Sequence, residues 1–187
     1  HSRKRLFHYQ LSPAAFSQVN YSQNSRIIDL VLDNSGETSN SLALDLYCGI
    51  GNLTLPISLK NDSVIGIETG TVAVKWAIRN ARENGIKNCS FLQLDALEGL
   101  QYLRKKGMQP AFLVLDPPRS GARDVFLEIS RSYRDFIKKI IYISCHPATF
   151  SRDVGILAGA GFQLERISLV DMFPHSYHTE IVASLLI

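Results

Sequence analysis

The stretch "LALDLYCGIGNLTLP" (Leu42–Pro56) decides the expected fold, because an apolar strand-like run ends in a glycine turn that opens a second apolar segment. Gly49 and Gly51 allow the backbone to turn tightly and to approach a ligand closely. Asn52 suits the N-cap of the helix expected next. A strand, a glycine turn and a helix in this order are typical of the first ligand-binding turn of an open α/β sheet.

Apolar strand-like runs alternate with helical patterns from Ser41 onward, as expected for strands buried on both faces of a parallel sheet. Two last strands are joined by a link too short for a helix and must pair antiparallel. The expected fold is therefore a doubly wound, mostly parallel α/β sheet of Rossmann-like type with an antiparallel last strand. The expected strands are 42–48, 63–68, 89–94, 111–116, 139–144, 162–173 and 179–187.

The region before the sheet is expected to hold one helix over 14–33 and a linker over 34–40. We therefore divide the chain into an N-terminal segment with its helix, 1–40, and one domain, 41–187. With 45% apolar and 20% charged residues, the composition is that of a soluble globular protein. No apolar run reaches the roughly 20 residues of a membrane span. Three cysteines favour a reducing, cytoplasmic environment over a disulfide framework.

Carboxylates end three consecutive expected strands, at the edge where open α/β sheets bind ligands. Glu68 is placed to bind both hydroxyls of a ribose. Asp95 is placed either to accept from an adenine amino group or to cap the helix that begins at Ala96, and both roles are compatible. Asp116 is followed by two prolines and Arg119, which force the chain out of the sheet and hold these side chains at its edge.

The glycine turn favours S-adenosylmethionine over a nicotinamide dinucleotide. A dinucleotide site requires a third small residue, and that position is Thr54. Asp45 precedes the turn, where a carboxylate repels a pyrophosphate and suits a ligand with a positive centre and an amino group. A turn that binds nothing is the remaining alternative, and the convergence of so many features disfavours it.

The segment "IIYISCHPATF" (Ile140–Phe150) delivers Cys145 to a strand end just before a helix. A helix N-terminus lowers a thiol pKa, so Cys145 is expected to supply a thiolate. Cys48 and Cys89 are interpreted as packing residues. A thiolate beside a methyl donor suggests addition to carbon 6 of a pyrimidine, which activates carbon 5 for methylation.

A base must then remove the proton from carbon 5. The segment "DMFPHSYHTEIV" offers His175, His178 and Glu180, and the residues alone leave this choice open. A metal site built from Cys145, His146, His175 and His178 is disfavoured, because catalytic zinc sites have tighter ligand spacings. No metal is expected.

The segments "FSQVN" (Phe16–Asn20), "DPPRSG", "IIYISCHPAT" and "VDMFPHSYHTE" resemble the RNA (uracil-5-)-methyltransferases, which form 5-methyluridine in tRNA and 23S rRNA. The resemblance runs from about Ser12 onward and implies that 41–187 is an S-adenosylmethionine-dependent methyltransferase domain. It implies Cys145 as the nucleophile, Glu180 as the base, and Phe16 near the uracil. It also implies a set of cofactor contacts: Gln18, Tyr47, Asn52, Glu68, Asp95 and Asp116.

Three features depart from the family pattern: His146 stands where Asn is usual, Thr179 replaces an apolar residue, and the gap after Gly121 is longer. The expected partner is an rRNA or tRNA uridine, which the net charge of +3 permits. Family members usually carry N-terminal RNA-binding modules, an OB-like barrel or a four-cysteine iron–sulfur cluster, which are expected to be missing here. A cytoplasmic monomer without membrane association is expected.

Four other functions fit the sequence less well. A methyltransferase for exocyclic amines would carry an aromatic residue at Arg119 and need no cysteine, and a cytosine-5 RNA enzyme would carry a cysteine at Pro117-Pro118. A cofactor-binding or RNA-binding module without turnover would use neither Cys145 nor Glu180. A dehydrogenase is the least favoured.

Overall fold

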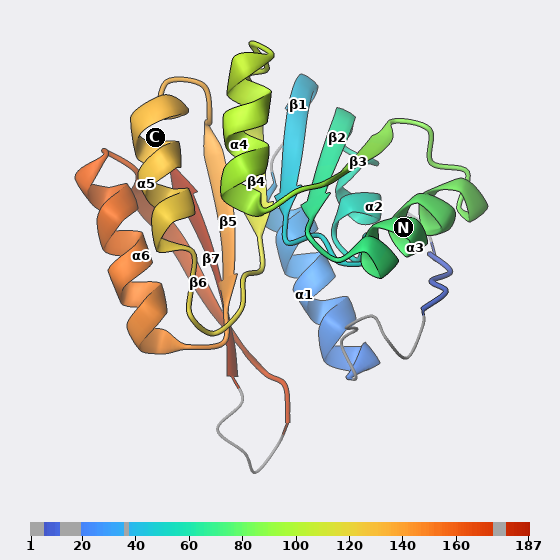
Figure 1. The fold of residues 1–187 in the computed structure, drawn as a ribbon. Helices are drawn as coiled ribbons and strands as arrows, with labels where there is room; N and C mark the ends of the chain where they lie inside the picture. Colours follow the sequence, from blue (N-terminus) through green and yellow to red (C-terminus); the bar gives the residue numbers. More distant parts are fainter. Residues whose placement is uncertain (1–5, 12–19, 36–37, 174–178) are drawn as a thin grey trace.

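The structure is a computed structural model that describes residues 6–11, 20–35, 38–173 and 179–187, with residues 38–40 described by their backbone alone. Its centre is one seven-stranded sheet in the order β3-β2-β1-β4-β5-β7-β6 (Figure 1). The strands are β1 Thr38–Leu46, β2 Asn61–Glu68, β3 Cys89–Gln93, β4 Pro110–Leu115, β5 Lys139–Ser144, β6 Gln163–Asp171 and β7 Thr179–Leu186. The helices are α1 Tyr21–Asn34, α2 Thr54–Ile57, α3 Thr71–Glu83, α4 Ala96–Lys105, α5 Arg123–Ser132 and α6 Pro147–Gly159.

The first five strands pair in parallel, and β7 lies antiparallel between β5 and β6. This arrangement confirms the expected doubly wound sheet with an antiparallel last strand. The nearly continuous apolar runs are explained by the two layers of helices, because both faces of the central strands are covered. Leu113 and Val114, neighbours on β4, are fully buried on opposite faces of the sheet.

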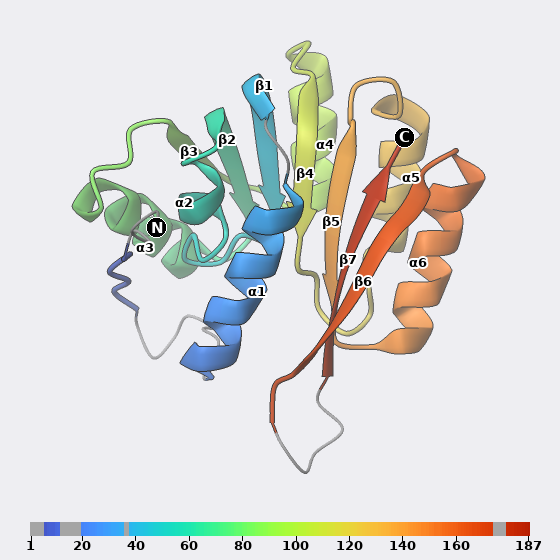
Figure 2. The same ribbon diagram turned by 180° about the vertical axis from the view of Figure 1, so that it is seen from behind.

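Helices α4, α5 and α6 cover one face, and α1 and α2 cover the other (Figures 1 and 2). Helix α3 packs against β2 and β3 at one end of the sheet. Among the described residues, no helix is both long and apolar enough to span a membrane.

The expected helix over 14–33 is wrong in its extent, because Asn20 has a non-helical backbone (φ −93°, ψ 90°) and α1 begins at Tyr21. The Asn20 side chain accepts a hydrogen bond from the Gln23 N–H, which caps the first turn. Residues 14–19 lie outside the described part. The expected linker over 34–40 is also shorter, because β1 begins at Thr38, where it pairs with Asn61.

The carboxyl ends of β1 to β5 meet at one edge of the sheet. Leu46 is in register with Ile67 and Leu115, Leu115 with Tyr142, and Glu68 with Gln93. The chain enters β7 at the same edge, because Ile181 is the register partner of Ser144. The residues that follow β1 to β5 and the first residues of β7 therefore share one site.

Candidate active site

Cys145 and Glu180 face the same edge of the sheet from neighbouring strands. Cys145 directly follows β5, and Glu180 is the second residue of β7, next to the register pair Ser144 and Ile181. The two side chains interact electrostatically, since the carboxyl of Glu180 raises the pKa of the Cys145 thiol. Residues far apart in the sequence thus form one potential nucleophile and base pair.

The expectation that Cys145 has a lowered pKa is wrong. Cys145 does precede α6, but burial raises the pKa of its thiol and Glu180 raises it further. Arg119 acts in the opposite direction through a hydrogen bond and its positive charge. Burial and the neighbouring carboxyl outweigh Arg119 and a backbone hydrogen bond, so the thiol is protonated at neutral pH and must lose its proton before it can react.

Glu180 has the features of a base held ready for a substrate. Its Oε2 atom is buried and has no hydrogen-bond partner among the residues that the structure describes. Burial raises the pKa of Glu180, and the charge of Arg119 partly offsets this effect. A buried carboxylate oxygen without a hydrogen-bond partner destabilises the fold, unless a bound ligand donates a hydrogen bond to it. The other base candidates, His175 and His178, lie outside the described residues.

Asp116 follows β4 and adds a second carboxyl group beside Glu180. Burial raises its pKa to about 8, with further contributions from Glu180 and Asp45. The Asp116 carboxyl is therefore mainly protonated at neutral pH and can donate a hydrogen bond as well as accept one.

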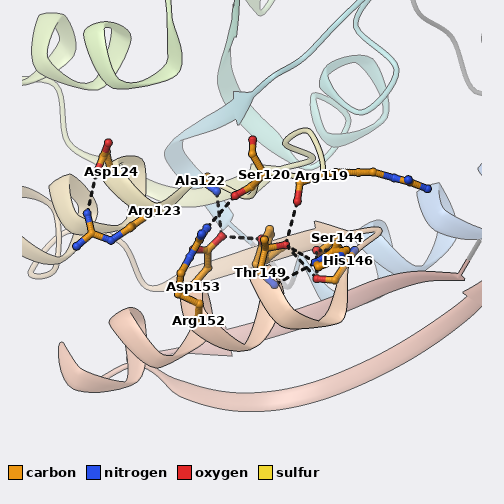
Figure 3. Close-up of polar contacts among 11 residues, drawn as sticks. Arg119, Ser120, Ala122, Arg123, Asp124, Ser144, His146, Thr149, Arg152 and Asp153 are labelled. Carbon is orange, nitrogen blue, oxygen red and sulfur yellow. Dashed lines mark hydrogen bonds and ion pairs between the residues drawn. The ribbon is translucent and has the colours of Figure 1, made fainter.

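The loop that carries Arg119 is fixed to α6 by a polar network (Figure 3). The Asp153 carboxylate, fully buried, accepts hydrogen bonds from the Ala122 N–H and the Tyr142 hydroxyl, both at 2.9 Å. The Thr149 hydroxyl donates to the Arg119 carbonyl oxygen at 3.2 Å. These bonds hold the segment after β4 against the first turns of the helix that follows Cys145.

We expect Asp153→Ala to lower the free energy of unfolding by about 3 kcal/mol, because it leaves the buried Ala122 N–H and Tyr142 hydroxyl without their acceptor. Asp124→Ala, which removes an exposed ion pair with Arg123 nearby, should cost less than about 1 kcal/mol. Urea unfolding followed by circular dichroism measures both. Equal losses in the two variants would show that Asp153 does not hold the loop.

The turn after β1 has the backbone expected of a glycine-rich ligand loop. Gly51 has φ +89°, and a Cβ there would lie 2.7 Å from Leu55 Cδ1, so only glycine fits. Tyr47 also has a positive φ, 65°, a strained conformation for a tyrosine that is characteristic of functional sites. The turn therefore fits close contact with a ligand.

Glu68 anchors this turn to the end of β2. One carboxylate oxygen accepts from the Gly49 N–H at 3.1 Å, and the other accepts from the Gly70 N–H at 2.7 Å. The oxygen that accepts from Gly70 also accepts from the Thr69 hydroxyl at 3.3 Å. One ribose hydroxyl can therefore bond to the lone pair left on the other oxygen, and a second would replace the Thr69 hydroxyl. Asp95 caps α4 in a capping box with Glu98 and is exposed at the same edge.

Two expectations about the turn are wrong. Asn52 is not the N-cap of α2, because the cap position is Leu53 and the Asn52 side chain instead pairs with Asn24 of α1 at 2.9 Å. Asp45 does not present a full charge to a ligand. It is 1% exposed and accepts from the Thr54 hydroxyl, and burial raises its pKa to about 7. The proposed repulsion of a pyrophosphate by Asp45 is accordingly weak.

Two cavities lie along this edge and share Tyr47. One, of about 300 Å³, lies between Asp95 and the segment Ser120–Val125. The other, of about 110 Å³, is lined by Tyr9, Leu11, Tyr21, Asn24, Tyr47, Cys48, Gly49, Ile50, Asn52 and Asp116. Together the cavities include most of the cofactor contacts expected from the sequence. Gln18 and Phe16 lie outside the described residues.

Sequence reasoning missed four residues that line the smaller cavity: Tyr9, Leu11, Tyr21 and Asn24. They precede the first expected strand and carry no motif of their own. The pairing of Asn24 with Asn52 joins residues distant in sequence, which no local pattern reports. Within the described residues, no three His, Cys, Asp or Glu side chains gather to hold a metal ion.

Comparison with known proteins relates this chain to RNA methyltransferases. The chain is 38% identical over 176 residues to the 23S rRNA (uracil(1939)-C(5))-methyltransferase RlmD of Methylococcus capsulatus, covering 94% of this chain and 39% of that protein. It is 38% identical over 178 residues to an uncharacterized RNA methyltransferase of Thermotoga maritima, and the match covers 95% of this chain and 39% of that protein. The chain also superposes on the crystal structure of Pyrococcus abyssi tRNA (uracil-54, C5)-methyltransferase in complex with S-adenosyl-L-homocysteine. The TM-score is 0.77 and the sequence identity 27%, and the match covers 95% of this chain and 42% of that chain.

These comparisons confirm the expected fold class and the family resemblance. The chain spans only 39% of the length of each of the two relatives. Over residues 2–186 it matches the tRNA (uracil-5-)-methyltransferase family, and it belongs to that family.

Proposed function

We propose that this chain methylates carbon 5 of a uridine in rRNA or tRNA with S-adenosylmethionine as the methyl donor. The observation that carries the proposal is the proximity of the Cys145 thiol and the Glu180 carboxyl, which flank the register pair Ser144 and Ile181 at the edge that also carries the glycine turn. Addition to carbon 6 needs a sulfur nucleophile, and removal of the carbon 5 proton needs a base. The names of the relatives support the reaction and the RNA substrate.

The residues at the sheet edge fit this cofactor. The glycine turn allows close approach, Glu68 retains an acceptor position for a ribose hydroxyl, and Asp95 is exposed where an adenine amino group can reach it. Tyr47, Asn52 and Asp116 line the adjoining cavity. When bound, S-adenosylmethionine supplies an electrophilic methyl group on a sulfonium centre. Gln18 completes the proposed set of contacts.

Cys145 begins the proposed reaction after its partly buried thiol has released its proton to solvent water, so that the Glu180 carboxylate is left free for the later step. The thiolate lone pair forms a bond to carbon 6 of the uracil, and the electrons of the carbon 5–carbon 6 double bond move toward the oxygen on carbon 4. Carbon 5 is now nucleophilic and would bond to the methyl group as the bond from that methyl to the sulfonium sulfur breaks, which would leave a neutral thioether. The positive charge of Arg119 favours the thiolate, because it lowers the pKa of Cys145.

Glu180 completes the reaction by taking the proton from carbon 5. The electron pair of that carbon–hydrogen bond restores the double bond to carbon 6, and the bond from carbon 6 to sulfur breaks. Cys145 leaves as a thiolate and the uracil keeps the methyl group. The raised pKa of Glu180 brings its basicity closer to that required near neutral pH.

The second candidate, methylation of an exocyclic amine, would need neither Cys145 nor Glu180. A cofactor-binding module without turnover also needs neither. RNA that contains 5-fluorouridine distinguishes these functions. Carbon 5 then carries fluorine in place of the proton that the base removes, so the reaction stops at the covalent adduct.

We expect the protein, with S-adenosylmethionine and 5-fluorouridine RNA, to form an adduct that survives denaturation and maps to Cys145 by mass spectrometry. The same RNA with unmodified uridine is the control and should release methylated product. Absence of an adduct, with cofactor and RNA binding demonstrated, would contradict the cysteine mechanism and favour the amine methyltransferase.

A further inference from the structure

Residues 6–11, which we call the strap, run alongside α3 (Figures 1 and 2). Two asparagines of this region hold the strap by its backbone. The Asn84 side chain accepts from the His8 N–H at 2.9 Å and donates to the His8 carbonyl oxygen at 2.7 Å. The Asn80 side chain accepts from the Gln10 N–H at 2.9 Å and donates to the Gln10 carbonyl oxygen at 3.1 Å.

Two asparagines four positions apart on the helix can hold every second residue of an extended chain, because the two distances match. Four residues of a helix rise about 6 Å, and two residues of an extended chain advance about 6.6 Å. Each asparagine side chain offers an oxygen acceptor and an N–H donor, so it satisfies both polar groups of one backbone residue. The strap is therefore bound in a single register.

Asn80 also ties the strap to the glycine turn. Its side chain, fully buried, donates a second hydrogen bond to the Ile50 carbonyl oxygen at 3.1 Å. The Tyr9 hydroxyl donates to the Asn52 carbonyl oxygen at 3.1 Å, which makes a second link to the same turn. Burial raises the pKa of Tyr9 well above its ordinary value, so the hydroxyl remains a donor.

The strap brings Tyr9 and Leu11 into the lining of the 110 Å³ cavity, which Gly49 and Asp116 also line. Glu68 and Asp95, the residues proposed for ribose and adenine, do not line this cavity. Since ribose and adenine are assigned to residues outside this cavity, the cavity is left for the amino-acid end of the cofactor.

We propose that the strap forms one wall of the cofactor pocket, around the amino-acid end of the cofactor, and that Asn80 and Asn84 are positioning residues for that wall. This inference rests on the proposed function, because it assumes that the pocket binds S-adenosylmethionine. Tyr9 and Leu11 touch the cofactor, and the two asparagines act through them.

The test compares two ligands that differ at this end. S-adenosylhomocysteine carries the amino acid, and 5′-methylthioadenosine lacks it. We expect Asn84→Ala to weaken S-adenosylhomocysteine about tenfold in calorimetric titration and to leave 5′-methylthioadenosine within about twofold. Gln10→Pro, which removes a strap N–H without changing α3, should have the same effect.

Asn88→Ala is the matched control. The Asn88 side chain is partly buried like Asn84 and donates to two backbone oxygens, those of Ser58 at the end of α2 and Asn61 at the start of β2, neither of which lines the cavity. It should leave both affinities unchanged. Hydrogen exchange without ligand should quicken at the His8 and Gln10 amides in Asn84→Ala and remain unchanged in Asn88→Ala.

The outcomes separate this inference from the proposed function. If the unaltered protein does not bind S-adenosylhomocysteine, the proposed function is wrong. If it binds and the strap variants bind both ligands as tightly as it does, the strap is not a wall of the pocket. Equal weakening of both ligands would also overturn the inference, because it would show a general loss of folding.

Discussion

Cys145→Ala is expected to reduce methyl transfer to RNA by at least about 10⁴-fold and to leave S-adenosylhomocysteine affinity within a few-fold. Among the described residues at this edge, the acids Asp116 and Glu180 are poor nucleophiles toward carbon 6, and the Cys48 thiol is buried with its pKa raised well above the ordinary value. The fold should survive, since Cys145 follows the last residue of β5 and is only partly buried. Transfer of labelled methyl groups to RNA measures the first effect, and calorimetry the second.

Cys89→Ala is the matched control for this experiment. Cys89 is also partly buried, and burial raises the pKa of its thiol, to about 11, but it lies at the start of β3, far from the site edge. Its replacement should leave turnover nearly unchanged. If Cys145→Ala still transferred methyl groups to RNA, the covalent mechanism would be wrong.

Glu180→Gln is expected to accumulate a covalent RNA–protein adduct on unmodified uridine. Glutamine has nearly the same shape as glutamate but does not accept the carbon 5 proton, so addition and methylation proceed while elimination stalls. The adduct should carry the transferred methyl group, which labelled S-adenosylmethionine reveals in a denaturing gel. Mass spectrometry should place the methylated uridine on Cys145.

Glu165→Gln serves as the control, because Glu165 lies on the adjacent strand β6 and bonds to Lys139 and Ser184 away from the site. It should turn over normally without a stable adduct. Normal turnover in Glu180→Gln as well would show that another base removes the proton, and His178 would become the candidate.

Local patterns in the sequence determined the order of strands and helices and the direction of the last strand. They also located the residues of the site edge, because the carboxyl ends of parallel strands must lie together. The position of Cys145 after β5 and the capping role of Asp95 were both predicted in this way and are confirmed. Each follows from a short run of neighbouring residues.

The tertiary structure alone decided how the site residues are charged and what they contact. The pKa of Cys145 is raised because burial and Glu180 outweigh Arg119 and a backbone hydrogen bond, and both raising contributions depend on segments distant in the sequence. Asn52 bonds to Asn24 for the same reason. Desolvation, charge interactions and long-range hydrogen bonds depend on distances in the folded chain. The sequence by itself could therefore place Cys145 at the edge of the sheet, but only the packed structure determines its protonation.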